Sequence, residues 1–456
     1  MTRWLAAAVL LGAPSLDAAS GRPDPKPCFI LILSDDQRAD ALGCAGNPHI
    51  RTPNLDALAA RGRRFTNAFV TCSICSPSRA ACLTGLYGSV NGVMNLGGRL
   101  RRPGETYAQA LRAAGYRTGH VGKWHLANRP EDCGFDRVAC FEANGPYRGR
   151  KVAEQGKARV VEGFIDEYVA DQSIAFLEES AKSGAPFVLS VCTQAPHMAW
   201  DPRPETLALY DAARLPVPPT WKDGLAGKPP YLGDSRFRRR ALQYGYDHEE
   251  GIRGHLRAYY AAITDMDAAL GRVFKAVETT GLAGRTTLVF MGDNGWAMGD
   301  HGLTSKVLPY EPMFRVPLIV AGPGVRAGVD HRLVLNIDAY PTLLELAGLR
   351  APRRVHGASL VPLLQGREDA PWREAFLYEA PVPELDSRPL LAVRTARWKY
   401  IRTLDPDRPG QPAWEELYDL EGDPGERVNL ALRDAPPAAL AAMRDRLEEL
   451  KKGVAE

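Results

Sequence analysis

Long apolar runs alternate with amphipathic segments along the chain up to about position 370. Strands that are buried on both faces read as continuous aliphatic runs, and such runs occupy residues 28–33, 116–122, 186–191, 286–291 and 316–320. Apolar residues at helical spacing predict helices at residues 54–61, 105–114, 168–183 and 255–280. This alternation predicts an α/β fold, in which a large mixed, mostly parallel sheet is flanked by helices.

The pattern changes after about residue 370. Short strand-like pieces separated by turns, followed by one amphipathic helix, indicate a smaller C-terminal α+β domain with an antiparallel sheet at residues 371–456. The preceding residues, 21–370, are predicted to form one catalytic domain. Within it, residues 201–253 are rich in Pro, Gly and charge and are expected to be a loop-rich insertion of functional importance.

The first twenty residues are typical of a secretory signal peptide. Arg3 supplies the positive charge, residues 5–13 form a short apolar run, and residues 18–20 are small. The run is too short to cross a membrane, and no later uncharged segment reaches spanning length. We therefore expect no membrane span and a secreted or periplasmic location.

The charge of the chain argues against a nucleic-acid or membrane partner, and the cysteine spacing argues against a zinc site. The net charge of +3 is too small to indicate a nucleic-acid or membrane partner. Basic character is local, at residues 99–102 and 236–240, where a solvated face is expected although an anionic substrate would also be favoured. The eight cysteines lack zinc spacing. Cys72 and Cys75 form one Cys-x-x-Cys pair, and Cys133 and Cys140 are close enough in sequence to form a disulfide.

The richest chemistry lies at residues 75–79, which read Cys-Ser-Pro-Ser-Arg. Pro is tolerated in the first turn of a helix, so Cys75 is expected at a helix start. The unpaired N–H groups there attract an anion, and Arg79 adds a planar set of donors suited to an oxyanion. The alternatives are a buried structural cysteine or, with Cys72, a redox pair.

Two acidic pairs follow two predicted buried strands. Asp35 and Asp36 come after the first, and Asp293 and Asn294 come after the run at 286–291. Sites in open α/β sheets form outside the carboxyl ends of the strands, although either pair alone is also typical of a turn. Three carboxylates and an amide oxygen suit Ca²⁺ or Mg²⁺ rather than zinc.

Residues 75–79 with Leu83-Thr84-Gly85 resemble the signature of type I sulfatases, of the alkaline-phosphatase-like superfamily. The resemblance implies that a formylglycine-generating enzyme converts Cys75 to formylglycine, whose hydrate is the nucleophile. It also implies a bound metal, usually Ca²⁺ and less often Mg²⁺. Its ligands are carried over onto Asp35, Asp36, Asp293, Asn294 and residue 75.

Other motifs extend the resemblance along the chain. Gly-Lys-Trp-His at 122–125 implies that Lys123 binds sulfate and that His125 is a base. Ala-Pro-His at 195–197 places His197 beside the leaving oxygen, and residues 300–306 supply Lys306 as a second sulfate ligand. Arg79 is carried over as an oxyanion ligand. His301 is held as a neighbouring residue only, Asp265 and Asp267 as structural, and Trp124 and Trp296 as either pocket wall or core.

The resemblance implies a sulfatase that acts on sulfated carbohydrates, such as glycosaminoglycan or other polysaccharide fragments. An arylsulfatase on small aryl sulfates is the first alternative. A phosphohydrolase of the same superfamily is the second, although such enzymes carry Thr or Ser as nucleophile and often two zinc ions. A third alternative is a non-catalytic binding protein, should Cys75 stay unmodified.

Overall fold

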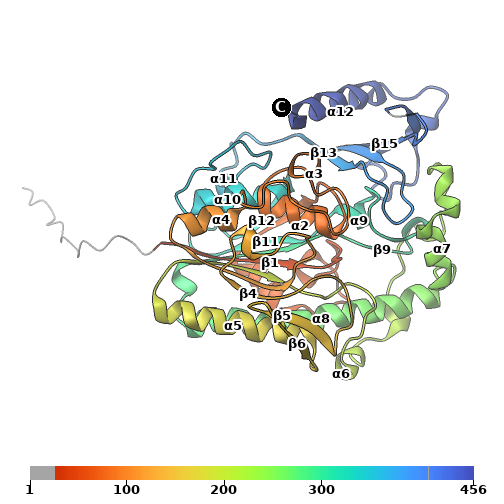
Figure 1. Cartoon of the computed structure of the whole chain (residues 1–456). Coiled ribbons are helices and arrows are strands. Elements are labelled where there is room, and N and C mark those ends of the chain that lie inside the picture. The colour runs from red at the N-terminus through yellow and green to blue at the C-terminus, as the bar shows by residue number, and fades with distance from the viewer. Residues whose placement is uncertain (1–25, 409, 456) are drawn as a thin grey trace, which may run out of the picture.

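The computed structural model describes residues 26–408 and 410–455, and the predicted signal peptide lies outside them. A ten-stranded sheet runs through the centre of the larger part of the molecule (Figure 1). Its strands, in spatial order, are β12 (Gly328–Leu335), β2 (Arg63–Phe69), β11 (Leu318–Ala321), β8 (Thr286–Gly292), β1 (Cys28–Ser34), β7 (Phe187–Cys192), β3 (Arg117–Lys123), β4 (Arg137–Phe141), β5 (Arg150–Glu154) and β6 (Lys157–Val161).

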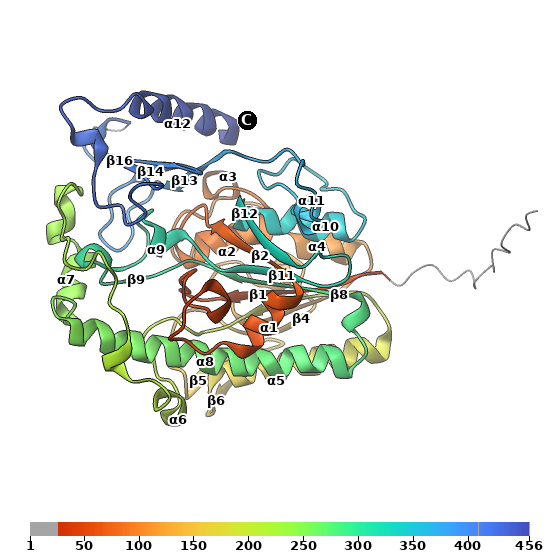
Figure 2. The ribbon, with the colours of Figure 1, turned by 180° about the vertical axis from the view of Figure 1, so that it is seen from behind.

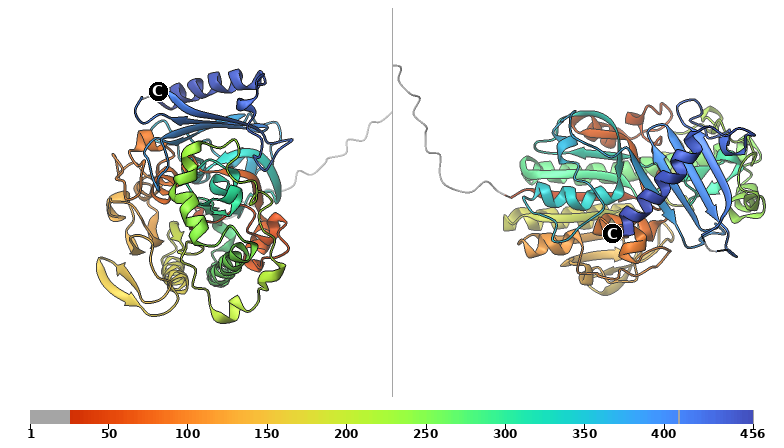
Figure 3. Two further views of the ribbon diagram at one scale, coloured as in Figure 1. Left: turned by 90° about the vertical axis from the view of Figure 1, so that its right-hand side faces the viewer. Right: turned by 90° about the horizontal axis from the view of Figure 1, so that it is seen from above.

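The prediction of a mixed, mostly parallel sheet is confirmed. β8, β1, β7, β3 and β4 pair in parallel, and β2 pairs in parallel with β12. β11 is antiparallel to both β2 and β8, and β5 and β6 form an antiparallel hairpin at the edge that projects from the body (Figure 3, left). β1 is buried at all seven positions, as its continuous apolar run predicts.

Helices cover both faces of this sheet (Figures 1 and 2). One face packs against α1 (Pro53–Arg61), α5 (Ile165–Ser183) and the long α8 (Glu249–Thr279). The other packs against α2 (Cys75–Thr84), α4 (Tyr107–Ala113), α10 (Ala339–Leu346) and α11 (Val361–Leu364). The shorter elements are α3 (Gly88–Asn91), α6 (Pro204–Leu207), α7 (Arg236–Gln243), α9 (Glu311–Phe314), β9 (Ala297–Met298) and β10 (Thr304–Ser305).

A four-stranded antiparallel sheet forms the C-terminal part, with α12 (Ala439–Ala455) lying across it (Figure 3, right). Its strands are β13 (Ala375–Ala380), β14 (Leu390–Thr395), β15 (Trp398–Leu404) and β16 (Pro412–Asp419). The predicted smaller C-terminal α+β part is therefore present, and residue 370 lies between α11 and β13.

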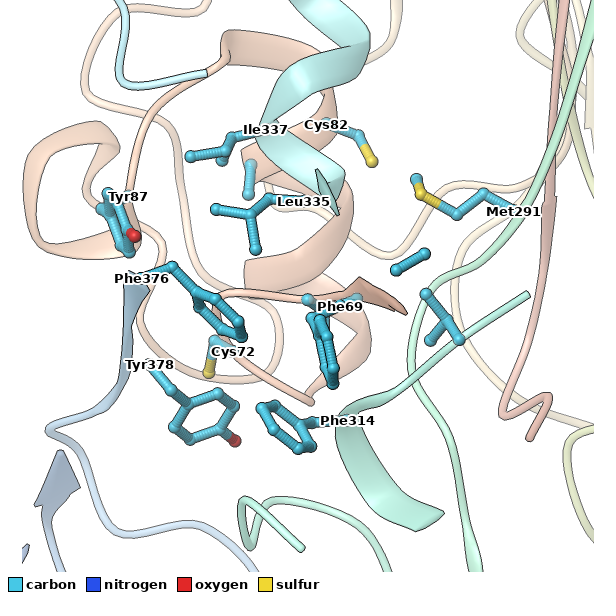
Figure 4. Packing of buried hydrophobic residues seen from close by; sticks show 14 of the residues in the cluster. Phe69, Cys72, Cys82, Tyr87, Met291, Phe314, Leu335, Ile337, Phe376 and Tyr378 are labelled. Atoms are coloured by element: carbon cyan, nitrogen blue, oxygen red, sulfur yellow. The ribbon is translucent and has the colours of Figure 1, made fainter. Parts of the chain in front are cut away.

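Aromatic packing joins the two parts (Figure 4). Phe376 and Tyr378 on β13 meet Phe69 and Phe314 from the larger part, with ring centroids 5.1 Å apart for Phe69–Phe376 and 5.6 Å apart for Phe314–Tyr378. Phe69 and Phe314 are themselves 4.9 Å apart. Aromatic pairs at such distances contribute about 0.5–1.5 kcal/mol each beyond the area they bury. The small sheet is thus fixed to the body by a continuous core.

The predicted insertion at 201–253 is more ordered than expected. The basic run at 236–240 forms the start of helix α7, because the Ser235 side chain caps it by accepting from the Arg238 N–H and because Phe237 and Ala241 bury one face. α8 begins at Glu249, earlier than the helix predicted at 255–280. β2 and β12 were not predicted, since polar and exposed residues interrupt their apolar positions.

No helix among the described residues is both long enough and apolar enough to span a membrane.

Candidate active site

Loops at the carboxyl ends of four neighbouring strands bring the predicted site residues together. Ser34, the last residue of β1, lies opposite Gly292 of β8, and Leu33 lies opposite Cys192 of β7. The side chains that follow these strand ends therefore meet at one edge of the sheet. They are all buried or nearly so and comprise Asp35, Asp36, Lys123, His197, Asp293 and Asn294.

Helix α2 aims its first residue at this edge. Cys75 is the first helical residue, and its Sγ lies 3.3 Å from Asp35 Oδ1. One turn later, Arg79 donates through Nε to Asp293 Oδ2 at 2.9 Å and through a terminal nitrogen to the Lys123 carbonyl at 3.0 Å. The helix start and its guanidinium thus face the carboxylates, as the sequence predicts.

Two lysines balance the carboxylates. Lys306 Nζ lies 2.8 Å from Cys75 Sγ and 2.5 Å from Asp36 Oδ1. Lys123 Nζ forms an ion pair with Asp35. Lys306 is reached through β10 and a tight turn in which Ser305 and Val307 both have positive φ. All four charged side chains are buried, so these pairs are weakly screened by solvent.

The cluster perturbs the pKa of each acidic group in it. Burial, reinforced by the charge of Asp35, raises the pKa of the Cys75 thiol to about 12 and that of Asp293 above its usual range. Burial likewise raises the pKa of Asp36, against the charge of Lys306. Burial would raise that of Asp35 too, but Lys123 and its neighbours hold it well below its usual value. The unmodified thiol is therefore a poor nucleophile at neutral pH.

The donor set fits a divalent cation. Asp35, Asp36, Asp293 and Cys75 each offer a ligand atom, and these atoms lie within 4.8 Å of one another. Asp36 Oδ2 and Asn294 Oδ1 are buried and form no hydrogen bond with the described residues. Such oxygens are costly unless something positive binds them. A site built mainly from carboxylate and amide oxygens suits a hard cation.

Two histidines lie beside the cluster. His197 Nε2 is 3.4 Å from Asp36 Oδ2, its Nδ1 contacts the Met198 carbonyl, and burial lowers its pKa to about 3. His125 follows β3 with φ of 63°, and its carbonyl accepts a 2.6 Å hydrogen bond from Ser76 Oγ on α2. Burial and the charge of Lys123 lower the pKa of His125 to about 2.

Close strand packing behind these residues depends on one glycine. Gly122 on β3 has φ of 99°, and a Cβ built there would lie 1.8 Å from the Cys192 carbonyl oxygen of β7. Only glycine can adopt this conformation at this distance. Gly122 therefore sets how closely the end of β3, which carries Lys123, approaches β7.

Of the two tryptophans expected in either the pocket wall or the core, one lies in each place. Trp296 lies at the site, with its ring 6.2 Å from that of His197 and 5.7 Å from Lys306 Nζ. Trp124 packs into the core, where its ring is 4.8 Å from that of His120. The first is a wall of the site, and the second supports β3 from behind.

The residues held as structural make structural contacts. Asp267 accepts from the Asn54 and Leu55 N–H groups at the start of α1. Asp265 accepts from the Arg203 N–H and from the Thr206 hydroxyl. The His301 ring lies 5.4 Å from the Tyr310 ring and is tilted by 54° to it. Burial and the charges of Lys228 and Lys399 lower the pKa of His301 to about 2, so His301 lies toward the small sheet.

Two residues at the site carry no motif by which sequence reasoning could find them. Asn144, in the loop between β4 and β5, accepts a hydrogen bond from Lys123 Nζ. Asp166, at the start of α5, accepts from the Gln194 and Ala195 N–H groups at 2.7 and 3.0 Å and so positions the loop that carries His197. Burial raises the pKa of Asp166 to about 7.

All eight cysteines lie within the described residues and are free thiols, seven of them buried. Cys133 and Cys140 do not form the disulfide considered from the sequence. Cys72 lies in the core shortly before the site and is not bonded to Cys75.

Comparison with known proteins gives one consistent family. Residues 27–349 match the model of the family described as "Sulfatase", and residues 299–453 match "N-sulphoglucosamine sulphohydrolase, C-terminal". The chain is 29% identical over 470 residues to an N-acetylglucosamine-6-O-sulfatase of Bacteroides thetaiotaomicron, covering 89% of this chain and 82% of the relative. It is 32% identical over 480 residues to human arylsulfatase A, covering 95% and 89%.

The fold also matches solved structures over nearly its whole length. One is a protein in complex with its substrate D-glucosamine-2-N,6-O-disulfate, with a TM-score of 0.86 and 26% identity. The alignment covers 94% of this chain and 98% of that protein.

Proposed function

This chain belongs to the sulfatase family and is a sulfuric ester hydrolase, and from that premise we propose that it removes sulfate from carbohydrates through formylglycine at residue 75 and a bound Ca²⁺. The observation that carries the proposal is the placement of Cys75 Sγ. It lies between the Asp35 carboxylate at 3.3 Å and the Lys306 ammonium at 2.8 Å, inside a buried carboxylate cluster.

Asp35, Asp36, Asp293 and Asn294 are the proposed metal ligands, together with residue 75. Ca²⁺ would supply positive charge against sulfate oxygens and lower the pKa of a hydroxyl at residue 75. Formylglycine, made from Cys75 by a formylglycine-generating enzyme, would supply a hydrated aldehyde as nucleophile. Mg²⁺ is the less favoured ion, because a cluster this rich in protein ligands leaves little room for the waters Mg²⁺ retains.

The surrounding side chains have proposed roles in binding and proton transfer. Arg79, Lys123 and Lys306 orient the sulfate and stabilise charge on its oxygens, because their donors are buried and fixed before substrate arrives. His197 faces the leaving alcohol through Nε2 and donates a proton to it as an imidazolium, because in the neutral ring the proton is held on Nδ1 by the Met198 carbonyl. A bound sulfate would favour this charged form, since a nearby negative charge raises the pKa of a histidine. His125 takes up a proton beside residue 75 when sulfate is released.

A carbohydrate substrate is supported by the relatives. The Bacteroides sulfatase is named for N-acetylglucosamine 6-O-sulfate chemistry, and the solved neighbour holds a sulfated glucosamine. The similarity to human arylsulfatase A supports small aryl sulfates as the alternative substrate class. The predicted signal peptide at residues 1–20 supports action outside the cytoplasm, either secreted or in a periplasm.

The test is sulfate release by protein that is produced together with a formylglycine-generating enzyme. Mass spectrometry of the tryptic peptide 65–79 establishes conversion at residue 75. We expect release from 6-sulfated glucosamine saccharides, loss of release in Cys75→Ala, and retention in the matched control Cys72→Ala. Converted protein that releases no sulfate from saccharides would refute the carbohydrate proposal, and release from p-nitrophenyl sulfate alone would favour the aryl alternative.

A further inference from the structure

A hollow lies at the opposite end of helix α2 from Cys75. It has a volume of about 440 Å³, within the range of about 300–1,000 Å³ in which ligand pockets fall. One acidic residue, Glu105, lines it, against four arginines, Arg101, Arg102, Arg353 and Arg354. We call it the arginine hollow. Its net charge is positive, and it includes part of the basic run at 99–102 that the catalytic site leaves unused.

Two of the arginines balance the single carboxylate. Arg353 Nε lies 2.8 Å from Glu105, and Arg102 lies 3.2 Å from it. Arg353 also donates to the Thr84 carbonyl at the end of α2, at 2.8 Å, so its guanidinium is held by structural contacts. An anion would therefore have to be bound by the remaining arginines.

Arg101 and Arg354 form no ion pair with any carboxylate among the described residues, although Arg354 also borders a neighbouring hollow lined in part by three acidic residues of α12. Arg101 donates only to the Ser89 and Val90 carbonyls, at 3.0 and 3.3 Å, and this holds its guanidinium in place. Arg354 is exposed and makes no hydrogen bond or ion pair through its side chain within the described part of the chain. Two guanidiniums without an ion-pair partner on one hollow are suited to an anion with several acceptor oxygens.

Because the hollow is concave, it suits a ring-sized ligand better than a flat binding partner such as a membrane. Leu86, Val90 and Leu100 contribute apolar surface to its lining, against which the C–H face of a sugar can pack. A membrane would need a protruding or planar basic face, and this site is concave. Helix α2 runs from Cys75 to Thr84, a length of about 15 Å at the usual helical rise. The hollow is therefore separate from the cluster at residue 75.

We propose that the arginine hollow binds a sulfate group of an extended sulfated saccharide, through Arg101 and Arg354, at a point distinct from the catalytic cluster. The preference for an anion rests on the arginines alone, whereas the choice of a saccharide rests on the proposed function. Binding is electrostatic and exposed, so it weakens as salt concentration rises.

The test is direct binding to full-length Cys75→Ala protein, which is not expected to consume the ligand. Isothermal titration calorimetry with a heparin hexasaccharide compares this protein with one that also carries Arg101→Gln and Arg354→Gln. Two lost charge-assisted contacts should raise the Kd by about tenfold or more. A matched control, Lys182→Gln with Arg214→Gln, removes two exposed charges elsewhere and should leave the Kd within about twofold.

Three outcomes would overturn the proposal. They are an equal loss of affinity in the control, no preference for the hexasaccharide over its desulfated form, and binding to phosphatidylglycerol vesicles in place of the saccharide. Arg354→Gln alone, at an exposed side chain without a partner among the described residues, answers the question if the double variant is unstable. Sulfate release by the wild-type protein is measured separately, so failure of the proposed function is told apart from failure of this site.

Discussion

Replacing Lys399 by methionine should uncover how the small sheet is held on the catalytic body. The Lys399 side chain is 0% exposed, and its Nζ lies 2.9 Å from Glu311 on α9 and 2.6 Å from Glu426 in the C-terminal part. Nζ also lies 4.5 Å from the centre of the Phe314 ring. Methionine keeps the length and the apolar packing of the stem but leaves two buried carboxylates without this cation.

Breaking one partner of a buried ion pair costs about 3–5 kcal/mol. The pKa of Glu311 agrees in direction: burial alone would raise it, but Lys399 and Arg394 lower it from 4.5 to about 2. For a chain of this size the loss corresponds to a fall in Tm of about 3–5 °C.

The dependence on pH has a definite sign. In the wild-type protein, Glu311 contributes stability above its unfolded pKa of 4.5, and this is lost as pH falls toward 2. In Lys399→Met, Glu311 keeps Arg394 and Arg315, whereas Glu426 loses the largest charge that opposes the rise of its pKa by burial, so stability is lost as pH rises above 4.5. The deficit of the variant should therefore be largest near pH 8 and smaller near pH 5.

Differential scanning calorimetry at pH 8 and pH 5 measures this deficit. Lys451→Met is the matched control, because Lys451 pairs with Glu448 at 2.8 Å but is 41% exposed. Exposed pairs of this kind contribute about 0–1 kcal/mol. Adding Glu426→Gln to Lys399→Met should restore part of the loss. A deficit that is equal at both pH values, or no larger than that of the control, would refute the reasoning.

Three further changes test the site itself. Gly122→Ala should lower stability by at least about 3 kcal/mol, read as a fall in Tm, because the new Cβ would meet the Cys192 carbonyl at 1.8 Å. Asp36→Asn should weaken Ca²⁺ binding in isothermal titration calorimetry by at least about tenfold, since it removes a charge from the ligand set; unchanged affinity would exclude Asp36 as a ligand. His197→Gln should reduce kcat by about 10²–10⁴-fold with little change in KM if it acts as the general acid, and a change in KM alone would contradict that role.

Much of the fold follows from particular runs in the sequence. β1, β7 and β8 are continuous apolar segments buried at every position, and each one is followed by a predicted site residue. Because parallel strands end at a common edge, residues that are 257 positions apart, Asp36 and Asp293, come within 3.1 Å of each other, N–H to carboxylate oxygen. The predicted strands and the motifs that follow them were therefore enough to predict which residues come together in the cluster.

The parts that the sequence did not reveal depend on tertiary contacts. α7 begins with a run made almost entirely of arginine and still forms, because Phe237 and Ala241 pack against the body. Asn144 and Asp166 act through single contacts to Lys123 and to the loop of His197, and no local pattern marks a single polar residue as a contact of this kind. Ion pairs such as Lys399 with Glu426 join separate segments of the chain, and no periodic pattern in the sequence marks them.

Under the proposed function, the burial of α2 would set an order of events in biosynthesis. Every residue of this helix is buried, and Cys75 is 0% exposed beneath the loops that close the site. An enzyme that oxidises Cys75 would need access to this side chain, which the folded chain buries. Under the proposed function, maturation must therefore occur while this segment is still unfolded, and a chain that folds first is trapped as an inactive thiol form.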